Sequence, residues 1–203
     1  MIRFGVIGTN WITDRFIDGA SKLADFKLNA VYSRTEEKAS EFASKYNVEH
    51  TYTTIQELAD SDKIDAVYIA SPTAYHCEHA IACMKGGKHV IVEKPFASNQ
   101  QEVQAMIDTA KQQNVTLMEA MKTTHTPNFK LIQESLDKIG PVRRYVANFC
   151  QYSSRYDKYK EGIVLNAFKP ELSNGSLMDI GVYCIYPMVA LFGKPETVQA
   201  NAW

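Results

Sequence analysis

The sequence has few cysteines, and none of them belongs to a C-x-x-C pair. Its four thiols, in a chain of 203 residues, are Cys77, Cys83, Cys150 and Cys184. Such a sparse set excludes a disulfide scaffold and argues against a structural zinc site. Because free thiols are typical of a reducing compartment, we predict a cytoplasmic protein.

Charge of one sign and long apolar runs are also scarce. The 22 Lys and Arg residues nearly balance the 23 Asp and Glu residues, and no basic cluster stands out. Neither nucleic acid nor a membrane surface is therefore an expected partner. No apolar run approaches the roughly 20 residues that span a bilayer. The opening MIRFGVIG is too short and too soon broken by glycine for a signal peptide.

Short β-rich runs alternate with helical patterns over residues 1–120. One example of a helical pattern is 36–46, where apolar residues recur at three-to-four spacing. Ser98 and Gln101 have the spacing of a capping box at the start of another helix. Continuous apolar strands between amphipathic helices predict an α/β domain with a doubly wound parallel sheet. The expected strands are 3–8, 26–33, 65–71, 88–93 and 115–120.

The pattern changes in residues 121–203, which we interpret as a second, partial α/β domain. An amphipathic helix is expected first, followed by a long strand, a polar loop, a second helix and the start of a further strand. Because a sheet that stops there has a bare edge, we expect the sequence to be a fragment of a longer protein. The expected ranges are 127–140, 142–152, 153–162, 176–193 and 197–203.

The turn after the first strand is the first candidate ligand site. A dinucleotide-binding turn has the pattern G-x-G-x-x-G/A and opens a helix whose N-terminus faces the pyrophosphate. Here only Gly8 matches. Asn10 replaces the second glycine and tolerates positive φ, and Thr13 replaces the third with a small residue. The turn therefore predicts a phosphate site at Gly8, Thr9, Asn10, Trp11 and Ile12, with an ordinary strand-to-helix turn as the alternative.

The end of the second strand indicates which cofactor is preferred. An NAD site places Asp or Glu about 20 residues after the glycines, where it binds the ribose hydroxyls. This strand ends instead in Ser33 and Arg34, with Lys38 one helical turn further on. A hydroxyl and a guanidinium suit a 2′-phosphate. We therefore predict NADP as the preferred cofactor, with NAD possible; a solvated arginine at a strand end is the alternative.

Several motifs occur in an order that points to one family. The segments GVIGTNWI, ASPTAYHCEHA, GGKHVIVEKPFA, LMEAM and GSLMDIGVYCI follow one another along the chain. Together they resemble the Gfo/Idh/MocA family of NAD(P)-dependent oxidoreductases, and most of all its dimeric dihydrodiol dehydrogenase and sugar dehydrogenase branch. Thr73 departs from the asparagine that many members carry, and Thr124 from a frequent arginine.

The resemblance implies a Rossmann domain followed by a domain with a large, mostly antiparallel open sheet, which often forms a dimer contact. We therefore expect a homodimer or a higher homo-oligomer. It also implies that Lys94, Tyr183 and Asp179 are catalytic, and that the Lys94–Pro95 bond is often cis. Cofactor contacts are implied at Ser71, Pro72, Thr73, His76, Glu93 and Lys94; no metal is expected.

Hydride transfer from an alcohol also requires a group that takes up the hydroxyl proton. A tyrosine hydroxyl can do this once a neighbouring ammonium lowers its ordinary pKa of about 10. Tyr183 is thus the expected acid/base, Lys94 its electrostatic partner and Asp179 an orienting group. Asp179 and Tyr183 are four residues apart, on one helix face, and Gly181 leaves room for a close approach. In a second mechanism Lys94 itself is the base, and Glu93 either orients Lys94 or meets the cofactor.

The combined prediction is an NADP-dependent oxidoreductase acting on CH–OH groups of a small-molecule sugar, polyol or trans-diol. A non-catalytic NAD(P)-binding sensor or corepressor of the same fold is the alternative. A redox-assisted glycosidase ranks last, because such enzymes usually depart from the EKP and tyrosine pattern.

Overall fold

The computed structural model describes residues 1–201, and the chain divides into two compact units. The first unit contains Met1–Ala120 together with Glu171–Ser173. The second contains Met121–Pro170 and Asn174–Trp203. The division near residue 120 matches the change of sequence pattern, except that three residues from the later part of the chain belong to the first unit.

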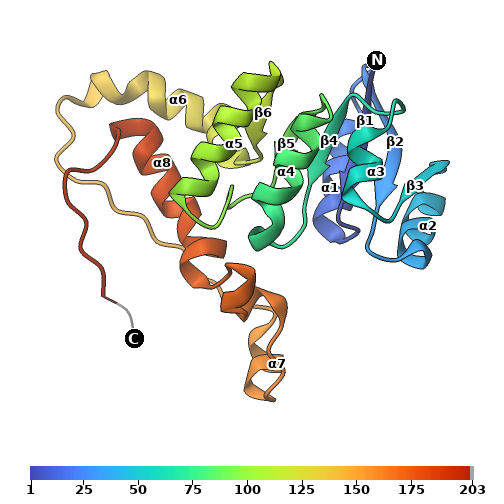
Figure 1. The fold of residues 1–203 in the computed structure, drawn as a ribbon. Helices are drawn as coiled ribbons and strands as arrows, with labels where there is room; N and C mark the ends of the chain where they lie inside the picture. Colours follow the sequence, from blue (N-terminus) through green and yellow to red (C-terminus); the bar gives the residue numbers. More distant parts are fainter. Residues whose placement is uncertain (202–203) are drawn as a thin grey trace. The chain divides into compact units, whose positions relative to one another are not determined.

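The first unit is built on a six-stranded parallel sheet in the order β3-β2-β1-β4-β5-β6 (Figure 1). The chain starts at a central strand, winds outward to one edge, and then crosses over to build the other half. This is the doubly wound Rossmann topology, which confirms the predicted α/β fold class. The strands are β1 (Ile2–Ile7), β2 (Phe26–Tyr32), β3 (His50–Tyr52), β4 (Ala66–Ile69), β5 (His89–Val92) and β6 (Leu117–Glu119).

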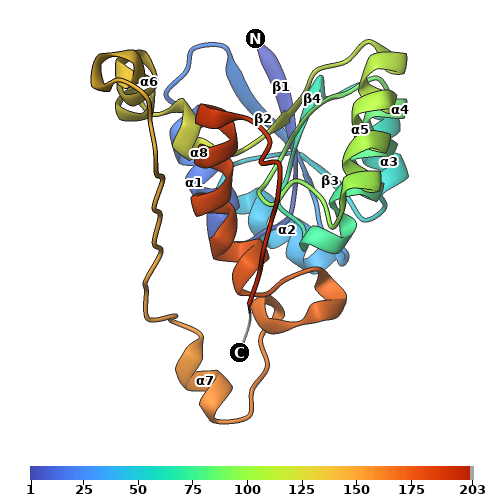
Figure 2. The ribbon, with the colours of Figure 1, turned by 90° about the vertical axis from the view of Figure 1, so that its left-hand side faces the viewer.

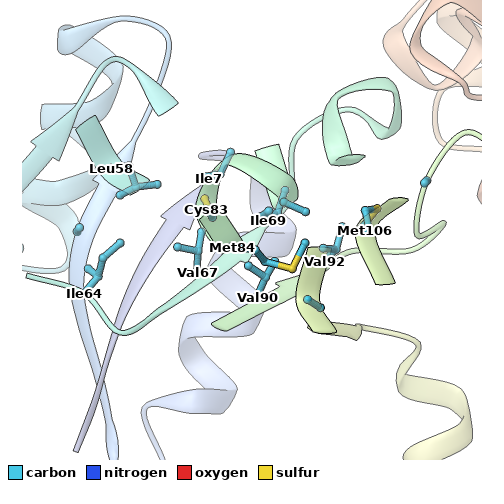
Figure 3. Close-up of a cluster of buried hydrophobic side chains, with 14 residues drawn as sticks. Ile7, Leu58, Ile64, Val67, Ile69, Cys83, Met84, Val90, Val92 and Met106 are labelled. Atoms are coloured by element: carbon cyan, nitrogen blue, oxygen red, sulfur yellow. The ribbon is translucent and has the colours of Figure 1, made fainter. Parts of the chain in front are cut away.

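Helices cover both faces of this sheet (Figure 2). On one face α1 (Trp11–Ala20) and α2 (Glu36–Lys45) bury an apolar cluster that includes Val6, Val31 and Tyr68. On the other face α3 (Ile55–Asp60), α4 (His76–Lys85) and α5 (Gln100–Gln113) bury a larger cluster. Figure 3 shows its members Ile7, Leu58, Ile64, Val67, Ile69, Cys83, Met84, Val90, Val92 and Met106.

Side-chain hydrogen bonds stabilise the pairing of β1 with β4 at both ends of the two strands. At one end the guanidinium of Arg3 donates to both carboxylate oxygens of Asp65, with distances of 2.6 and 3.0 Å. At the other end Asn10 Nδ2 donates to the carbonyl of Ala70 at 3.1 Å. These contacts bridge the two halves of the sheet where the chain crosses over.

The start of α5 differs from the predicted capping box. Asn99, not Ser98, caps the helix, because its side chain accepts the N–H of Glu102 at 2.9 Å. The Glu102 carboxylate in turn accepts the N–H of Ser98 at 2.9 Å. The predicted partner Gln101 is replaced by Glu102, one residue later, because the cap itself lies one residue later.

The second unit contains helices and extended chain. The predicted helix at 127–140 is α6 (Pro127–Ser135) followed by a 3₁₀ turn (Leu136–Ile139). The predicted polar loop at 153–162 contains a short helix, α7 (Tyr156–Lys160), and the predicted helix at 176–193 is a π-helical turn (Leu177–Gly181) continued by α8 (Val182–Phe192). Short 3₁₀ turns also occur at Lys122–His125 and Asn166–Phe168 of this unit, at Thr73–Tyr75 of the first unit, and at Pro170–Leu172, where the division between the units falls.

Two predicted strands of the second unit are not formed. Residues 142–152 and 197–201 have no strand structure, and residues 202–203 lie outside the described part. A strand requires a partner for its backbone N–H and C=O groups. No strand among the described residues offers one to these segments.

One apolar stretch is longer than the sequence analysis expected. By length and composition, the stretch Pro170–Phe192 is long and apolar enough to cross a membrane. The stretch begins with the separate 3₁₀ turn Pro170–Leu172, and residues 173–175 between this turn and the apolar helix are not helical. A core helix of a soluble protein passes the same test, so this observation is weak evidence for a span.

Candidate functional site

Gly8 forms the sharp turn at the carboxyl end of β1. Its φ is +102°, a conformation that residues with a Cβ rarely adopt. A Cβ at this position would lie 2.6 Å from the carbonyl oxygen of Ala70, at the end of β4. Only glycine therefore lets the end of β1 approach β4 this closely. The turn lies at the point where the strand order reverses, which is where open α/β sheets bind ligands.

Asn10 and Thr13 shape the turn in a way the sequence analysis did not foresee. Asn10 has a φ of −102°, so the expected positive φ is wrong. Its side chain instead caps α1 by accepting the N–H of Ile12 at 2.9 Å. Thr13 is fully buried, and its hydroxyl donates to the carbonyl of Gly8 at 2.8 Å. Asn10 and Thr13 stand where the second and third glycines are missing, and their side-chain hydrogen bonds stabilise the turn. Trp11, also expected here, is 64% exposed.

The predicted 2′-phosphate site lies where β2 ends. Ser33 is buried, and its N–H donates to the carbonyl of Tyr52 at 3.2 Å, which joins β2 to β3. Arg34 and Lys38 are exposed. Thr35 caps α2 between them, so both cations lie at the start of that helix. This chemistry fits an additional phosphate group, because a guanidinium and an ammonium are placed next to a helix N-terminus.

Residues Ser71 to His79 form a polar network after β4. His76 is 1% exposed, and its ring nitrogens lie 2.8 Å from the carbonyl oxygen of Ser71 and 3.0 Å from that of Pro95. His79 Nδ1 lies 3.1 Å from the hydroxyl of Ser71. Burial lowers the pKa of His76, and it lowers that of His79 to about 4. Thr73 is also buried, so the contacts of His76 and Thr73 are with the protein interior.

Lys94 lies at the carboxyl end of β5, as expected, and the bond from Lys94 to Pro95 is cis. The Lys94 backbone N–H donates to Glu93 Oε2 at 3.2 Å. The other carboxylate oxygen, Oε1, accepts the hydroxyl of Tyr68 at 2.6 Å. Together with the contact between His76 and Pro95, these bonds connect the segment around Lys94 to β4 and α4.

Glu119 adds a second carboxyl group to this edge of the sheet. It ends β6 and pairs in register with Val92 of β5. Burial raises the pKa of Glu119 to about 7, and the negative charge of Glu93 adds to this, while a hydrogen bond to the Phe96 backbone opposes it. The sequence analysis quoted LMEAM as a motif but did not single out this residue. A carboxyl at the end of a short apolar strand was the available signal.

The raised pKa of Glu119 makes stability depend on pH. From about pH 4.5, its ordinary pKa, to about pH 7, the unfolded chain loses this proton while the folded chain keeps it. The free energy of unfolding therefore falls as the pH rises through this window, by about 1–2 kcal/mol after allowance for partial exposure. We expect Glu119→Gln to remove this loss. The free energy of unfolding of the variant should therefore exceed that of the wild type by the largest amount at pH 8. Urea unfolding at pH 4.5 and pH 8 measures the difference.

Exposed Glu41 of α2 provides the matched control for this prediction. Glu41→Gln is expected to follow the wild-type pH dependence. An unchanged pH dependence in Glu119→Gln would show that this carboxyl ionises in the folded protein as it does in the unfolded chain.

Asp179 and Tyr183 belong to the second unit, and their meeting with Lys94 stays a prediction. Asp179 lies in the π-helical turn and Tyr183 in α8, so the two do not share one regular helix as expected. Asp179 pairs with Arg155 at 3.5 Å, and the Tyr183 ring packs on Phe149 with centroids 5.6 Å apart. A π-turn inside a helix is frequent at functional sites. A Cβ on Gly181 would meet the side chain of Leu177 at 2.8 Å, so this glycine accommodates its own helix.

Two residues that contact the candidate side chains were not predicted from the sequence. Arg155 was assigned to a loop, although it lies at the start of α7 and pairs with Asp179. Tyr68 was counted only as part of an apolar strand. Tyr68 could have been found from the sequence, because it is the one residue with a hydroxyl in a strand that is otherwise apolar. Nothing in the sequence indicated the role of Arg155.

Comparisons with known proteins show the family and the fold of the chain. The family model for the Gfo/Idh/MocA oxidoreductases, described as an oxidoreductase family with an NAD-binding Rossmann fold, matches residues 2–121. The chain therefore belongs to this family. A crystal structure of an NAD-binding protein from Listeria innocua shares the fold, with a TM-score of 0.72 and 22% identity over 94% of this chain and 54% of that chain.

Two curated relatives match nearly the whole chain. The NADP(+)-dependent scyllo-inositol 2-dehydrogenase of Bacillus subtilis is 62% identical over 100% of this chain and 62% of its own length. The trans-1,2-dihydrobenzene-1,2-diol dehydrogenase of Xenopus tropicalis is 32% identical over 99% of this chain and 60% of its own. The chain thus spans about three fifths of the length of these relatives.

Proposed function

We propose that the protein is an NADP-dependent oxidoreductase that transfers hydride between the nicotinamide and a secondary alcohol or carbonyl of a sugar, polyol or trans-diol. The observation that carries the proposal is the arrangement of Gly8, Arg34 and Lys94 at the carboxyl ends of β1, β2 and β5. Family membership and the names of the two relatives support it. The first substrates to test are scyllo-inositol and a trans-dihydrodiol.

The residues of the first unit fit the cofactor in three places. The glycine turn and the start of α1 suit the pyrophosphate, because helix N-terminal N–H groups favour anions. Ser33, Arg34 and Lys38 suit the 2′-phosphate, and Lys94 lies at the strand end where the nicotinamide is expected. When bound, the nicotinamide supplies the acceptor for the hydride that leaves the alcohol carbon.

The remaining chemistry is assigned to three side chains. Tyr183 takes the hydroxyl proton as the carbonyl forms and returns it in the reverse direction. Lys94 binds the same oxygen and stabilises the charge on the tyrosine. Asp179 orients the substrate or Lys94. Within the second unit its partner Arg155 holds the carboxylate in place.

We also propose that the protein acts in the cytoplasm as a homodimer or higher homo-oligomer. Four unpaired cysteines support the cytoplasmic assignment, because free thiols are typical of a reducing compartment. The dimer follows from the family resemblance. Light scattering on the purified protein tests the oligomeric state, and a monomer at micromolar concentration would contradict it.

Cofactor selectivity tests the proposal directly. We expect the protein to bind NADPH more tightly than NADH, because Arg34 and Lys38 pair with the 2′-phosphate. Arg34→Ala should weaken NADPH binding about 10–100-fold and leave NADH binding almost unchanged. Fluorescence titration with both reduced cofactors measures this.

Lys27→Ala is the matched control for Arg34→Ala. Lys27 is an exposed cation on the same strand β2, at its opposite end. Lys27→Ala should change neither the affinity for NADPH nor the affinity for NADH. Tighter binding of NADH by the wild-type protein would contradict the NADP assignment, and binding without turnover of any diol or polyol would favour a sensor.

A further inference from the structure

Tyr68 places a hydroxyl group inside an otherwise apolar core. The residue lies in β4, is 1% exposed, and stacks its ring on Phe16 of α1 with centroids 3.9 Å apart and planes 3° from parallel. Burial, together with the charge of Glu93, raises the pKa of Tyr68 far above its ordinary value. The hydroxyl therefore keeps its proton and acts as a hydrogen-bond donor.

The acceptor of this hydroxyl is Glu93, the residue before Lys94. Tyr68 Oη donates to Glu93 Oε1 at 2.6 Å, while Glu93 Oε2 accepts the backbone N–H of Lys94 at 3.2 Å. The Glu93 backbone N–H donates to the carbonyl of Ile69 at 2.8 Å. The carboxylate thus joins a buried donor on β4 to the backbone of Lys94. Hydrogen bonds to a charged group are stronger than neutral ones, and the 2.6 Å bond from Tyr68 is the shorter of the two in this link.

We infer that Tyr68 is a positioning residue for Lys94 and that it acts through the carboxylate of Glu93. The inference rests on the proposed function, in which the ammonium of Lys94 meets the reacting oxygen. Lysine carries its ammonium on a flexible four-carbon stem, and the backbone sets the point and direction from which this stem starts. Fixing the backbone N–H of Lys94 therefore limits where its ammonium can go, and a small misplacement lowers the rate of a positioned reaction.

This assignment corresponds to one of the two roles expected for Glu93, the orientation of Lys94. Both of its carboxylate oxygens accept protein donors, one from Tyr68 and one from Lys94. That geometry supports orientation of Lys94.

Tyr68→Phe tests the inference, because it removes the hydroxyl and keeps the ring that stacks on Phe16. We expect kcat to fall about 10–100-fold, while the Kd for NADPH changes less than about threefold. Tyr46→Phe is the matched control, because it also removes a partly buried hydroxyl that donates to a carboxylate other than Glu93. Tyr46 lies at the end of α2, and its hydroxyl donates to Asp14 Oδ1 of α1 at 2.5 Å. Its kcat should stay within about twofold of the wild type.

Three outcomes of this comparison would overturn the inference. One is an unchanged kcat in Tyr68→Phe. Another is an equal loss in Tyr46→Phe, which would indicate a general effect of removing a buried hydroxyl. The third is weaker NADPH binding with an unchanged kcat, which would make Tyr68 a cofactor residue.

A double-mutant cycle tests whether Tyr68 acts through Glu93. Glu93→Gln should lower kcat, and adding Tyr68→Phe to it should lower kcat by less than about threefold more, because the two groups form one link. If the double variant loses kcat by the product of the two single-variant factors, the Tyr68 hydroxyl acts independently of Glu93. That result would overturn the proposed route through Glu93.

A readout that needs no turnover separates this inference from the proposed function. Lysines labelled by reductive ¹³C-methylation give NMR signals, and Lys94→Arg identifies the signal of Lys94. We expect this signal to shift in Tyr68→Phe and to stay in place in Tyr46→Phe. An unshifted signal would overturn the positioning role even if the wild-type protein oxidises polyols. A shifted signal would support it even if no substrate is turned over.

Discussion

Lys94→Met and Tyr183→Phe should each lower turnover about 10²–10⁴-fold and leave NADPH binding largely intact. The size is that of losing a positioned acid/base group or the charge that assists it. Lys94→Met removes the ammonium and keeps most of the side-chain volume, whereas Tyr183→Phe removes one hydroxyl and keeps the ring that packs on Phe149. Steady-state oxidation of a polyol or diol, followed as NADPH formation, measures kcat, and fluorescence titration measures cofactor binding.

Each variant has a control in its own unit. Lys85→Met removes an exposed ammonium at the end of α4. Tyr145→Phe removes a hydroxyl that donates to the carbonyl of Cys184 at 3.1 Å, beside Tyr183 in the chain. Both controls should keep nearly full turnover. Full activity in Tyr183→Phe would disprove the tyrosine assignment and leave Lys94 as the base.

Gly8→Ala should prevent cofactor binding and destabilise the first unit. The added Cβ would lie 2.6 Å from the carbonyl oxygen of Ala70, and the φ of +102° is strained for alanine. Backbone atoms cannot move aside as a flexible side chain can, so the ends of β1 and β4 must separate. We expect NADPH affinity to fall more than about 100-fold and the free energy of unfolding to fall by about 2–4 kcal/mol.

Gly19→Ala is the control for this substitution, because a Cβ on Gly19 in α1 meets no atom within 4 Å. It should stabilise the protein by about 0.5–1 kcal/mol, since alanine is the better helix former. Urea unfolding and NADPH titration of both variants give the comparison. Wild-type affinity in Gly8→Ala would mean that the turn does not hold the pyrophosphate.

The parallel sheet could be predicted because its signal is local and repeated. Strands such as β4 are apolar on both faces, and only a sheet covered by helices on both sides buries such strands. The strand β3 was missed, because its sequence His-Thr-Tyr is too short and too polar to give a period. Its existence depends on β2, which supplies its pairing partners.

The predictions that failed depend on distant partners or on fine backbone geometry. The segment 142–152 has strand composition but no strand to pair with among the described residues. The π-turn before Tyr183 leaves the apolar pattern almost unchanged, so the sequence could not reveal it. Asn10 was explained by its tolerance of positive φ, whereas its function is to cap α1 and bind Ala70.

The pairing of β1 with β4 has a consequence for the order of folding. Phe4 of β1 pairs with Ala66, 62 residues later, whereas neighbours within each half of the sheet follow one another more closely in the chain. Closing the longest loop is the slowest kind of contact to form, so the two halves are expected to fold first and then join. In that order of folding, the glycine turn and the end of β4 are expected to come together at the last step. A nucleotide bound there cannot speed the earlier steps, and it acts instead by slowing the separation of the two halves.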